Sequence, residues 1–186
     1  MKEWGDPLFC LYYEVNVLTA KKKTGNTVEL VRKLAQPIAK DLGLSIWDVR
    51  FLKEGAEWYL RIFIDKPGRI GIDDCEAMSH AINAPLDELD PVEQGYCLEV
   101  CSPGMDRELV RPEHFAAFIG SKLAVKLIRP LENGRRELTG KLVDYSQNSV
   151  ISLQTDEGEN ISMAQKDTSS VRLVEDEDFV EVLRNE

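Results

Sequence analysis

The side chains that could carry out chemistry in this chain are few and lie far apart in the sequence. Ser102 is a potential nucleophile next to a predicted turn, but neither histidine, His80 or His114, adjoins it as a general base would. Folding could still bring a base to this serine. The consecutive carboxylates Asp73 and Asp74 are more typical of the beginning of a helix than of an acid–base pair. The sequence therefore predicts no catalytic residue.

The four cysteines, Cys10, Cys75, Cys97 and Cys101, are too scattered to form a disulfide framework. Cys97 and Cys101 share one face of a predicted strand, where about 3.3 Å per residue places them roughly 13 Å apart. This distance is too long for a disulfide bond or for a shared metal ion. The sequence also lacks the short motifs of phosphate-binding loops, dinucleotide-binding folds, serine hydrolases and zinc proteases. We therefore expect no metal site, no cofactor, no small-molecule substrate and no enzymatic activity.

The formal net charge of −10 restricts the partners that the chain can bind. Proteins that bind nucleic acid through their overall charge are basic, so an acidic chain needs a local basic patch or a basic protein partner. One basic patch lies between positions 121 and 141, where six basic residues outnumber two acidic ones. A solvated face of a barrel with a charged loop is an equal alternative for this segment. The candidate phosphate contacts within it are Lys122, Lys126, Arg129, Arg135 and Arg136.

Residues 96–107 combine a predicted strand, a turn and a charged pair. The strand alternates, with Leu98 and Val100 on the same side. The four residues from Ser102 to Met105 fit a type II turn, because proline favours its first central position and glycine provides the positive φ of the second. The candidate contact residues of this segment, either between domains or with a partner, are Ser102, Pro103, Gly104, Asp106 and Arg107.

The first half of the chain predicts an α+β domain over residues 26–107, in which two helices cover a three-stranded sheet. Asn26 and Asp73 are the expected N-caps of the two helices, because each precedes a glutamate three residues later. The two strands between the helices are expected to form an antiparallel hairpin. The expected elements are, in order, a helix over 26–42, strands over 44–53 and 58–65, a helix over 73–90 and a strand over 96–101.

The second half predicts a short linker helix over 108–120 and a small SH3/Sm-like β-barrel over 121–174. Pro112 suits the first turn of that helix and Gly120 suits its end. Short strands separated by turn residues are typical of a closed barrel. The expected strands lie at 122–129, 135–145, 149–155, 159–164 and 170–174. Residues 1–25 are expected to be an N-terminal appendage, and residues 175–186 an acidic, solvated tail.

The sequence indicates a protein of the cytoplasm. No apolar stretch approaches the ~20 residues needed to cross a bilayer, so no membrane partner is expected. The first residues lack a basic segment followed by an uninterrupted apolar one, since Glu3, Asp6 and Glu14 fall within them. A secretory signal is therefore not expected.

Residues 96–107 resemble the L-E-V-S-S-P-G-L-D-R-P signature of the bacterial ribosome maturation factor RimP family. Two further segments, 61–65 and 71–75, resemble a strand and the beginning of a helix in that family, and Asp90-Pro91 recurs before the signature strand. The resemblance covers about residues 26–174. The chain departs from the pattern at Cys101, Met105 and Glu108, where the family commonly has Ser, Leu and Pro; the last change leaves the exit from Arg107 less rigid.

The resemblance implies the α+β domain followed by the SH3/Sm-like barrel. It also implies a non-enzymatic assembly factor, required for maturation of the small (30S) ribosomal subunit, that binds the free subunit through ribosomal protein and rRNA contacts. The basic small-subunit protein S twelve is the implied protein partner, and the chain is expected to be a monomer. The alternative is an Sm-like RNA-binding regulator, which would form a ring.

Overall fold

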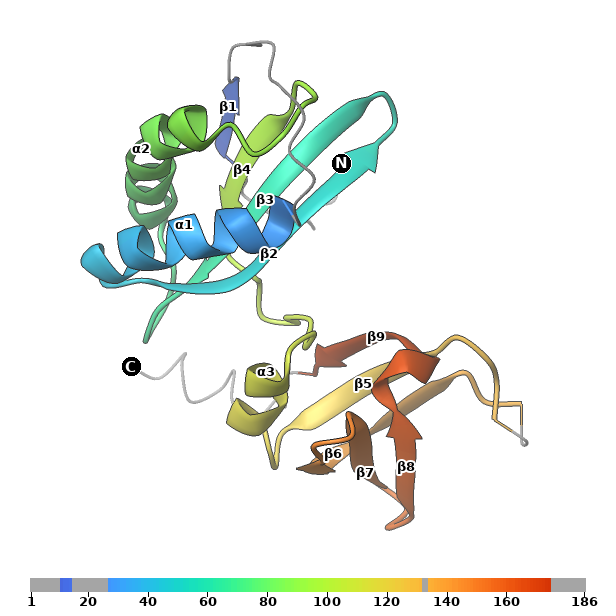
Figure 1. Ribbon diagram of the computed structural model, residues 1–186. Helices are drawn as coiled ribbons and strands as arrows, with labels where there is room; N and C mark the ends of the chain where they lie inside the picture. The colour runs from blue at the N-terminus through green and yellow to red at the C-terminus, as the bar shows by residue number, and fades with distance from the viewer. Residues whose placement is uncertain (1–10, 15–26, 132–133, 175–186) are drawn as a thin grey trace, which may run out of the picture. The chain divides into compact units, whose positions relative to one another are not determined.

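The computed structural model describes residues 11–14, 27–131 and 134–174, which belong to two compact units divided between Gly104 and Met105 (Figure 1). The predicted N-cap Asn26, the acidic tail and most of the N-terminal appendage lie outside the described residues. Within the described part of the chain, no helix is both long and apolar enough to cross a bilayer.

The first unit contains two helices and a mixed sheet (Figure 1). Its elements are β1 (Leu11–Glu14), α1 (Thr27–Asp41), β2 (Ser45–Glu54), β3 (Glu57–Asp65), α2 (Ile72–Leu89) and β4 (Cys97–Cys101). The predicted hairpin is confirmed, because β2 and β3 pair in antiparallel register up to Glu54 and Glu57. The prediction of three strands was incomplete: β1, from the segment expected to be an appendage, pairs with β4, and the strand order is β1-β4-β3-β2.

One apolar core holds the first unit together. Alternate residues of β3 and β4, such as Leu60, Ile62 and Val100, are fully buried and meet side chains from both helices. In α1 the buried residues are Val31, Ala35 and Ala39, which share one face at helical spacing. Strands and helices therefore present their apolar periodicities to the same core, as the sequence predicted.

The beginning of α2 differs from the prediction of Asp73 as its N-cap. Gly71 is the N-cap, and the backbone N–H of Gly71 donates a hydrogen bond to Asp74 Oδ2 at 2.7 Å. Lys66 Nζ lies 2.7 Å from the same carboxylate oxygen. Asp74 therefore satisfies the open backbone donor, and this leaves Asp73 in the first turn, where an acid is favourable to the helix dipole.

The second unit is an antiparallel sheet of five strands with one short helix (Figure 1). Its elements are α3 (Pro112–Ala117), β5 (Lys122–Leu127), β6 (Glu137–Tyr145), β7 (Val150–Thr155), β8 (Asn160–Ala164), the 3-10 turn η1 (Gln165–Asp167) and β9 (Thr168–Leu173). The strand order is β8-β7-β6-β5-β9. Within the residues that the structure describes, no ladder joins the outer strands β8 and β9, so this sheet is antiparallel but its closure into a barrel is not shown.

The inward-facing side chains of all five strands form the core of the second unit, and α3 adds Phe115 to it. Phe115 is completely buried, and its ring stacks on Tyr145 with 4.3 Å between the ring centres. The predicted helix at this position is confirmed, with Pro112 as its first residue. Its aromatic residue anchors it to the sheet, which is the physical reason why so short a helix is stable here.

Candidate functional site

The signature segment leaves the sheet after Cys101, at the position where a turn was predicted. Leu98 and Val100 of β4 point into the core of the first unit, as their alternation indicated. Gly104 has a φ of 78°, which confirms the left-handed conformation expected for glycine in the turn. The hydroxyl of Ser102 accepts a hydrogen bond from the N–H of Gly104 at 3.2 Å. The serine therefore stabilises the turn locally.

Asp106 and Arg107 follow the turn and contact residues of the second unit. Arg172 Nη1 on β9 lies 3.1 Å from Asp106 Oδ2, and both side chains are exposed. The guanidinium of Arg107 lies 6.0 Å from the centre of the Phe118 ring. Two alternatives were predicted for this pair, a contact between domains or a contact with a partner. The contacts with Arg172 on β9 and with Phe118 lie within the second unit, to which both residues belong, so both alternatives stay predictions.

Two of the five candidate phosphate contacts are paired with carboxylates. Lys122 Nζ lies 3.1 Å from Asp156 Oδ2, and Lys126 Nζ lies 3.0 Å from Glu137 Oε1. The shared strand parity of the two lysines is confirmed, since both residues pair across β6 in the same phase, opposite Lys141 and Glu137. These two charges are therefore partly compensated before any partner binds.

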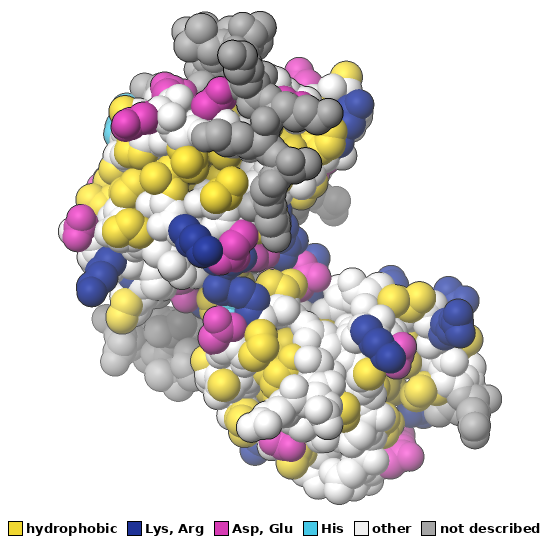
Figure 2. Space-filling view, in the orientation of Figure 1, with side chains coloured by type: hydrophobic (Ala, Val, Ile, Leu, Met, Phe, Trp, Pro, Cys, Tyr) yellow, Lys and Arg dark blue, Asp and Glu magenta, His cyan; other side chains and the backbone are white. Residues whose placement is uncertain are grey.

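The other three candidates lie at the connection from β5 to β6. Arg129, Arg135 and Arg136 are all exposed. The connection continues the β-ladder, because the N–H of Leu127 donates to the carbonyl of Arg136 at 2.7 Å and the N–H of Leu131 donates to that of Arg135 at 2.9 Å. Figure 2 shows Lys and Arg side chains gathered at this end of the second unit. We call Arg129, Arg135 and Arg136 the arginine hairpin.

The first unit holds a charge cluster that the sequence did not predict. Arg61 and Glu99 lie directly opposite each other on the parallel strands β3 and β4, and their side chains form an ion pair. Arg61 also donates two hydrogen bonds to the carboxylate of Glu54, at 2.7 and 2.9 Å. These hydrogen bonds raise the pKa of Arg61 and lower that of Glu54. The alternation of β3 and β4 was the available signal, since both residues lie opposite in parity to the core.

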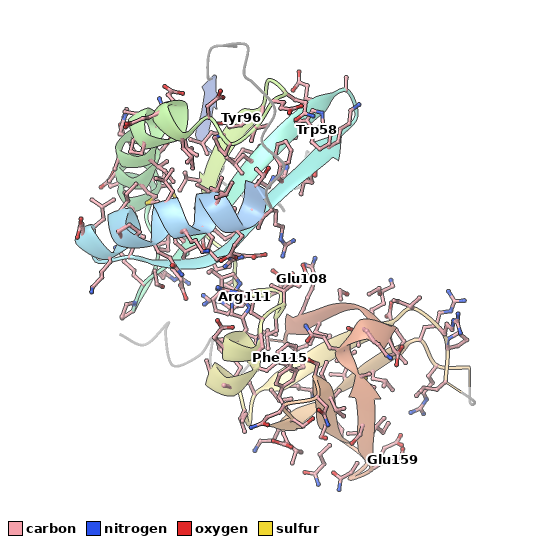
Figure 3. The ribbon with its side chains drawn as sticks, in the orientation of Figure 1. Trp58, Tyr96, Glu108, Arg111, Phe115 and Glu159 are labelled. Atoms are coloured by element: carbon pink, nitrogen blue, oxygen red, sulfur yellow. The ribbon has the colours of Figure 1, made fainter. Side chains whose placement is uncertain are left out.

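An aromatic group lies at the hairpin end of the first unit (Figure 3). Phe51 stacks on Trp58 at 4.8 Å between ring centres and makes an edge contact with Tyr96 at 6.4 Å. Burial, with a contribution from the nearby carboxylates of Asp87 and Asp90, raises the pKa of Tyr96 to about 12. The phenol therefore stays neutral at ordinary pH.

The described residues contain no group of three or more His, Cys, Asp or Glu side chains that could hold a metal ion. His114 is buried in the second unit, where its Nδ1 accepts a hydrogen bond from the N–H of Val110 at 3.2 Å. Arg111 Nη2 lies 2.9 Å from Nε2 of the same ring. The described contacts of this histidine therefore fix the segment before α3.

The fold and its surfaces define a protein of two units, one α+β and one antiparallel β, that exposes an arginine hairpin. Residues 34–106 match the family model described as the RimP N-terminal domain. This segment includes β3 and β4, which hold the segments 61–65 and 97–101 that resemble the family, the helix α2 between them, and the signature residues up to Asp106. This match supports a relationship of the chain to the RimP family of ribosome maturation factors.

One solved structure is similar to part of the chain. It is described as "Structural basis of the Dcp1:Dcp2 mRNA decapping complex activation by Edc3 and Scd6", and its chain is 23% identical to this one. The match covers 34% of this chain and 62% of that chain, with a TM-score of 0.28. The chain thus spans less than two thirds of the length of that structure's chain, and so low a structural score carries no argument about fold or function.

Proposed function

We propose that this protein is a non-enzymatic assembly factor of the cytoplasm that binds the free small (30S) ribosomal subunit during its maturation. The match of residues 34–106 to the RimP N-terminal domain is the observation that carries this proposal. It covers the core strands, α2 and the signature turn of the first unit. A maturation factor binds an incomplete particle and leaves it, so its surfaces must provide both protein and RNA contacts of limited strength.

The arginine hairpin is the proposed rRNA contact. Arg129 and Arg136 have no carboxylate within ion-pair distance among the described residues, whereas Lys122 and Lys126 each have one. Free guanidinium groups bind phosphates by two parallel hydrogen bonds, and paired lysines must first lose an existing partner. We therefore rank Arg129 and Arg136 above the lysines as phosphate contacts.

A basic ribosomal protein is the proposed second partner, with protein S twelve as the candidate from the family resemblance. Residues 27–104 of the first unit carry fourteen acidic and eight basic side chains. The helix α2 contains five acids and no lysine or arginine. Such a surface favours a basic protein and repels rRNA, so the first unit would bind the protein partner and not the rRNA.

The proposal includes a monomer with an SH3/Sm-like barrel as its second unit. One core cluster takes side chains from all five strands, as a curled sheet would require. Pairing of neighbouring copies through their sheet edges would need the outer edge of β9. That edge carries hydrogen bonds from the same chain, since the N–H of Leu109 donates to Val171 and the N–H of Leu173 donates to Arg107. This occupied edge supports the monomer over the ring-forming RNA regulator.

Sedimentation of the purified chain with ribosomal particles tests the proposed function. We expect the chain to sediment with free small subunits and not with translating ribosomes. The double variant Arg129→Gln/Arg136→Gln should sediment less, while the matched variant Lys122→Gln/Lys126→Gln should retain most binding. Equal sedimentation with both kinds of particle, or with neither, would refute the assembly role. A ring-sized mass in solution would favour the RNA regulator instead.

A further inference from the structure

The two edges of the second sheet differ in their hydrogen bonding. At β9 the preceding segment 107–109 runs alongside the strand, with hydrogen bonds of 2.8 and 3.1 Å and a bridge between Glu108 and Arg172. At β8 the sheet order ends. The chain thus protects one edge with its own backbone, while no described strand pairs with the other edge.

The alternation of hydrogen-bonded pairs between β7 and β8 identifies the backbone N–H and C=O groups of β8 that point outward. Thr155 donates to the carbonyl of Glu159, and Gln165 donates to the carbonyl of Ser149. Hydrogen-bonded pairs alternate along an antiparallel ladder, so Ile161 and Met163 bond to β7 as well. The N–H and C=O groups of the intervening residues, Asn160, Ser162 and Ala164, therefore point away from the sheet.

Most of these outward groups are available for pairing. Across the ranges that the structure describes, Asn160 and Ser162 have no backbone hydrogen bond on their outer side, whereas the carbonyl of Ala164, the N-cap of η1, accepts the first bond of that 3-10 turn. The side chains of Asn160 and Ser162 are exposed as well. Edge strands are commonly protected by lysine, proline or a bulge. The sequence of β8, Asn-Ile-Ser-Met-Ala, contains no charge and no proline, and its register with β7 has no bulge.

The charge next to β8 indicates what would pair with it. The segment 150–165 carries three acids and no lysine or arginine. Asp156 is paired with Lys122, but Glu157 and Glu159 have no ion-pair partner among the described residues. Glu159 lies immediately before β8, at the end of the second unit (Figure 3). A nucleic acid would be repelled here, and a polypeptide with basic residues would be attracted.

We propose that β8 binds an extended, basic segment of another protein by strand addition, antiparallel to β8, with the basic residues of that segment beside Glu157 and Glu159. Backbone hydrogen bonds to Asn160, to Ser162 and to the N–H of Ala164 would supply the pairing, and the acids would select the charge. This inference deepens the protein-binding part of the proposed function, on which it rests, because it places such a partner on the second unit as well.

Residue-resolved amide exchange of the full chain tests the proposal. The probe is acetyl-Thr-Val-Thr-Val-Thr-Lys-Lys-amide, whose lysines would reach the acidic turn in an antiparallel arrangement. In the free chain we expect slow exchange at Ile161 and Met163, and fast exchange at Asn160, Ser162 and Ala164. With the probe, the three fast amides should slow by roughly tenfold or more. A peptide with Glu in place of both Lys should have no effect.

Two matched controls separate strand addition from charge attraction alone. A probe N-methylated at alternate amides keeps its charge but cannot pair, so it should give no protection. Ser162→Pro removes an outward N–H without touching the ladder to β7 and should abolish protection, whereas Ser162→Ala should retain it. If Ser162→Pro does not fold, the N-methylated probe still decides the question.

Several outcomes would overturn the proposal. They are equal protection by the N-methylated probe, protection that survives Ser162→Pro, no protection by the lysine probe, or protection that grows with protein concentration when no probe is present. The last result would mean that a second copy occupies the edge. Binding of the probe by a chain that fails to sediment with small subunits would retain the strand-addition site and refute the assembly role, so the two proposals fail separately.

Discussion

Arg61 and Glu99 lie directly opposite each other on parallel strands, and Glu99 is 99% buried where it meets the guanidinium. The side chain of Arg61 is 23% exposed to solvent, and it also forms an ion pair with the exposed Glu54. A buried carboxylate beside a partly solvated cation is a stable arrangement only while both partners are present. The pair therefore joins β3 to β4 on the face opposite the core.

Replacement of Arg61 by Met should destabilise the first unit by about 2–4 kcal/mol, because it leaves the buried carboxylate of Glu99 without its cation. Urea unfolding of the variant measures this loss. The double variant Arg61→Met/Glu99→Leu should recover most of it, since no buried charge remains. Glu54→Gln is the control, because its exposed side chain contributes much less. A double variant no more stable than Arg61→Met would contradict this account.

Asp74 should make the stability of α2 depend on pH. The Lys66 ammonium, with the N–H of Gly71, holds the pKa of Asp74 below its ordinary value of 3.8. A carboxyl whose pKa is lower in the folded state stabilises the fold above the ordinary pKa, and this contribution disappears as the pH falls through the lowered value. The difference in the free energy of unfolding between the natural chain and Asp74→Asn should therefore shrink below about pH 4.

The matched variant Asp73→Asn separates the contacts of Asp74 from the general charge of the first helical turn. Asp73 neighbours Asp74 in the first turn, but it has no hydrogen-bond or ion-pair partner within the residues that the structure describes. Unfolding at pH values from neutral to acidic measures both variants. An equal pH dependence for the two would show that the general charge of the helix, and not the contacts of Asp74, is responsible.

Two glycines should respond to alanine for different reasons. Gly104→Ala should cost about 1 kcal/mol, because alanine resists the positive φ of the turn. Gly140→Ala should cost roughly 2–3 kcal/mol, because its Cβ would lie 2.6 Å from the carbonyl oxygen of Gln154 on β7. Thermal unfolding followed separately for the two units checks the ranking. A larger loss of stability for Gly104→Ala would mean that the turn stabilises contacts beyond its own backbone conformation.

The arginine hairpin should control the salt dependence of RNA binding. Each phosphate contact contributes ~0.7–0.9 to the slope of log affinity against log salt. Arg129→Gln/Arg136→Gln should therefore lower the slope with small-subunit rRNA by about 1.4–1.8 if both residues bind phosphates. Lys122→Gln/Lys126→Gln should change it less, because their charges are already paired. Titrations at several salt concentrations measure both slopes. An equal change in slope for the two double variants would contradict the ranking of the arginines above the lysines.

Much of this fold follows from local patterns in the sequence. The hairpin of β2 and β3, the helix that begins at Pro112 and the positive φ of Gly104 were all predicted, since each depends on residues close together in the chain. β1 was missed because its pairing with β4 joins segments more than eighty residues apart. The N-cap of α2 was misplaced because Lys66 and Gly71, which lie before the predicted helix, fix Asp74.

The candidate site was predictable as a set of charges but not as a geometry. The sequence placed basic residues between 121 and 141, yet it could not separate Lys122 from Arg129, because the partner Asp156 comes from the turn between β7 and β8. Parity alone would have put Arg61 and Glu99 on one face. Their direct contact needed the parallel register of β3 and β4, which no local signal specifies.

The asymmetry of the second sheet limits what strand addition can build. A filament or a ring built by strand pairing needs two open sheet edges on every copy, because each added copy must provide an edge for the next one. Among the described residues, the second sheet has one open edge, at β8, because residues 107–109 pair along the other. Pairing through this edge can therefore join at most two copies of the chain, so the second sheet cannot by itself build a filament or a ring of copies.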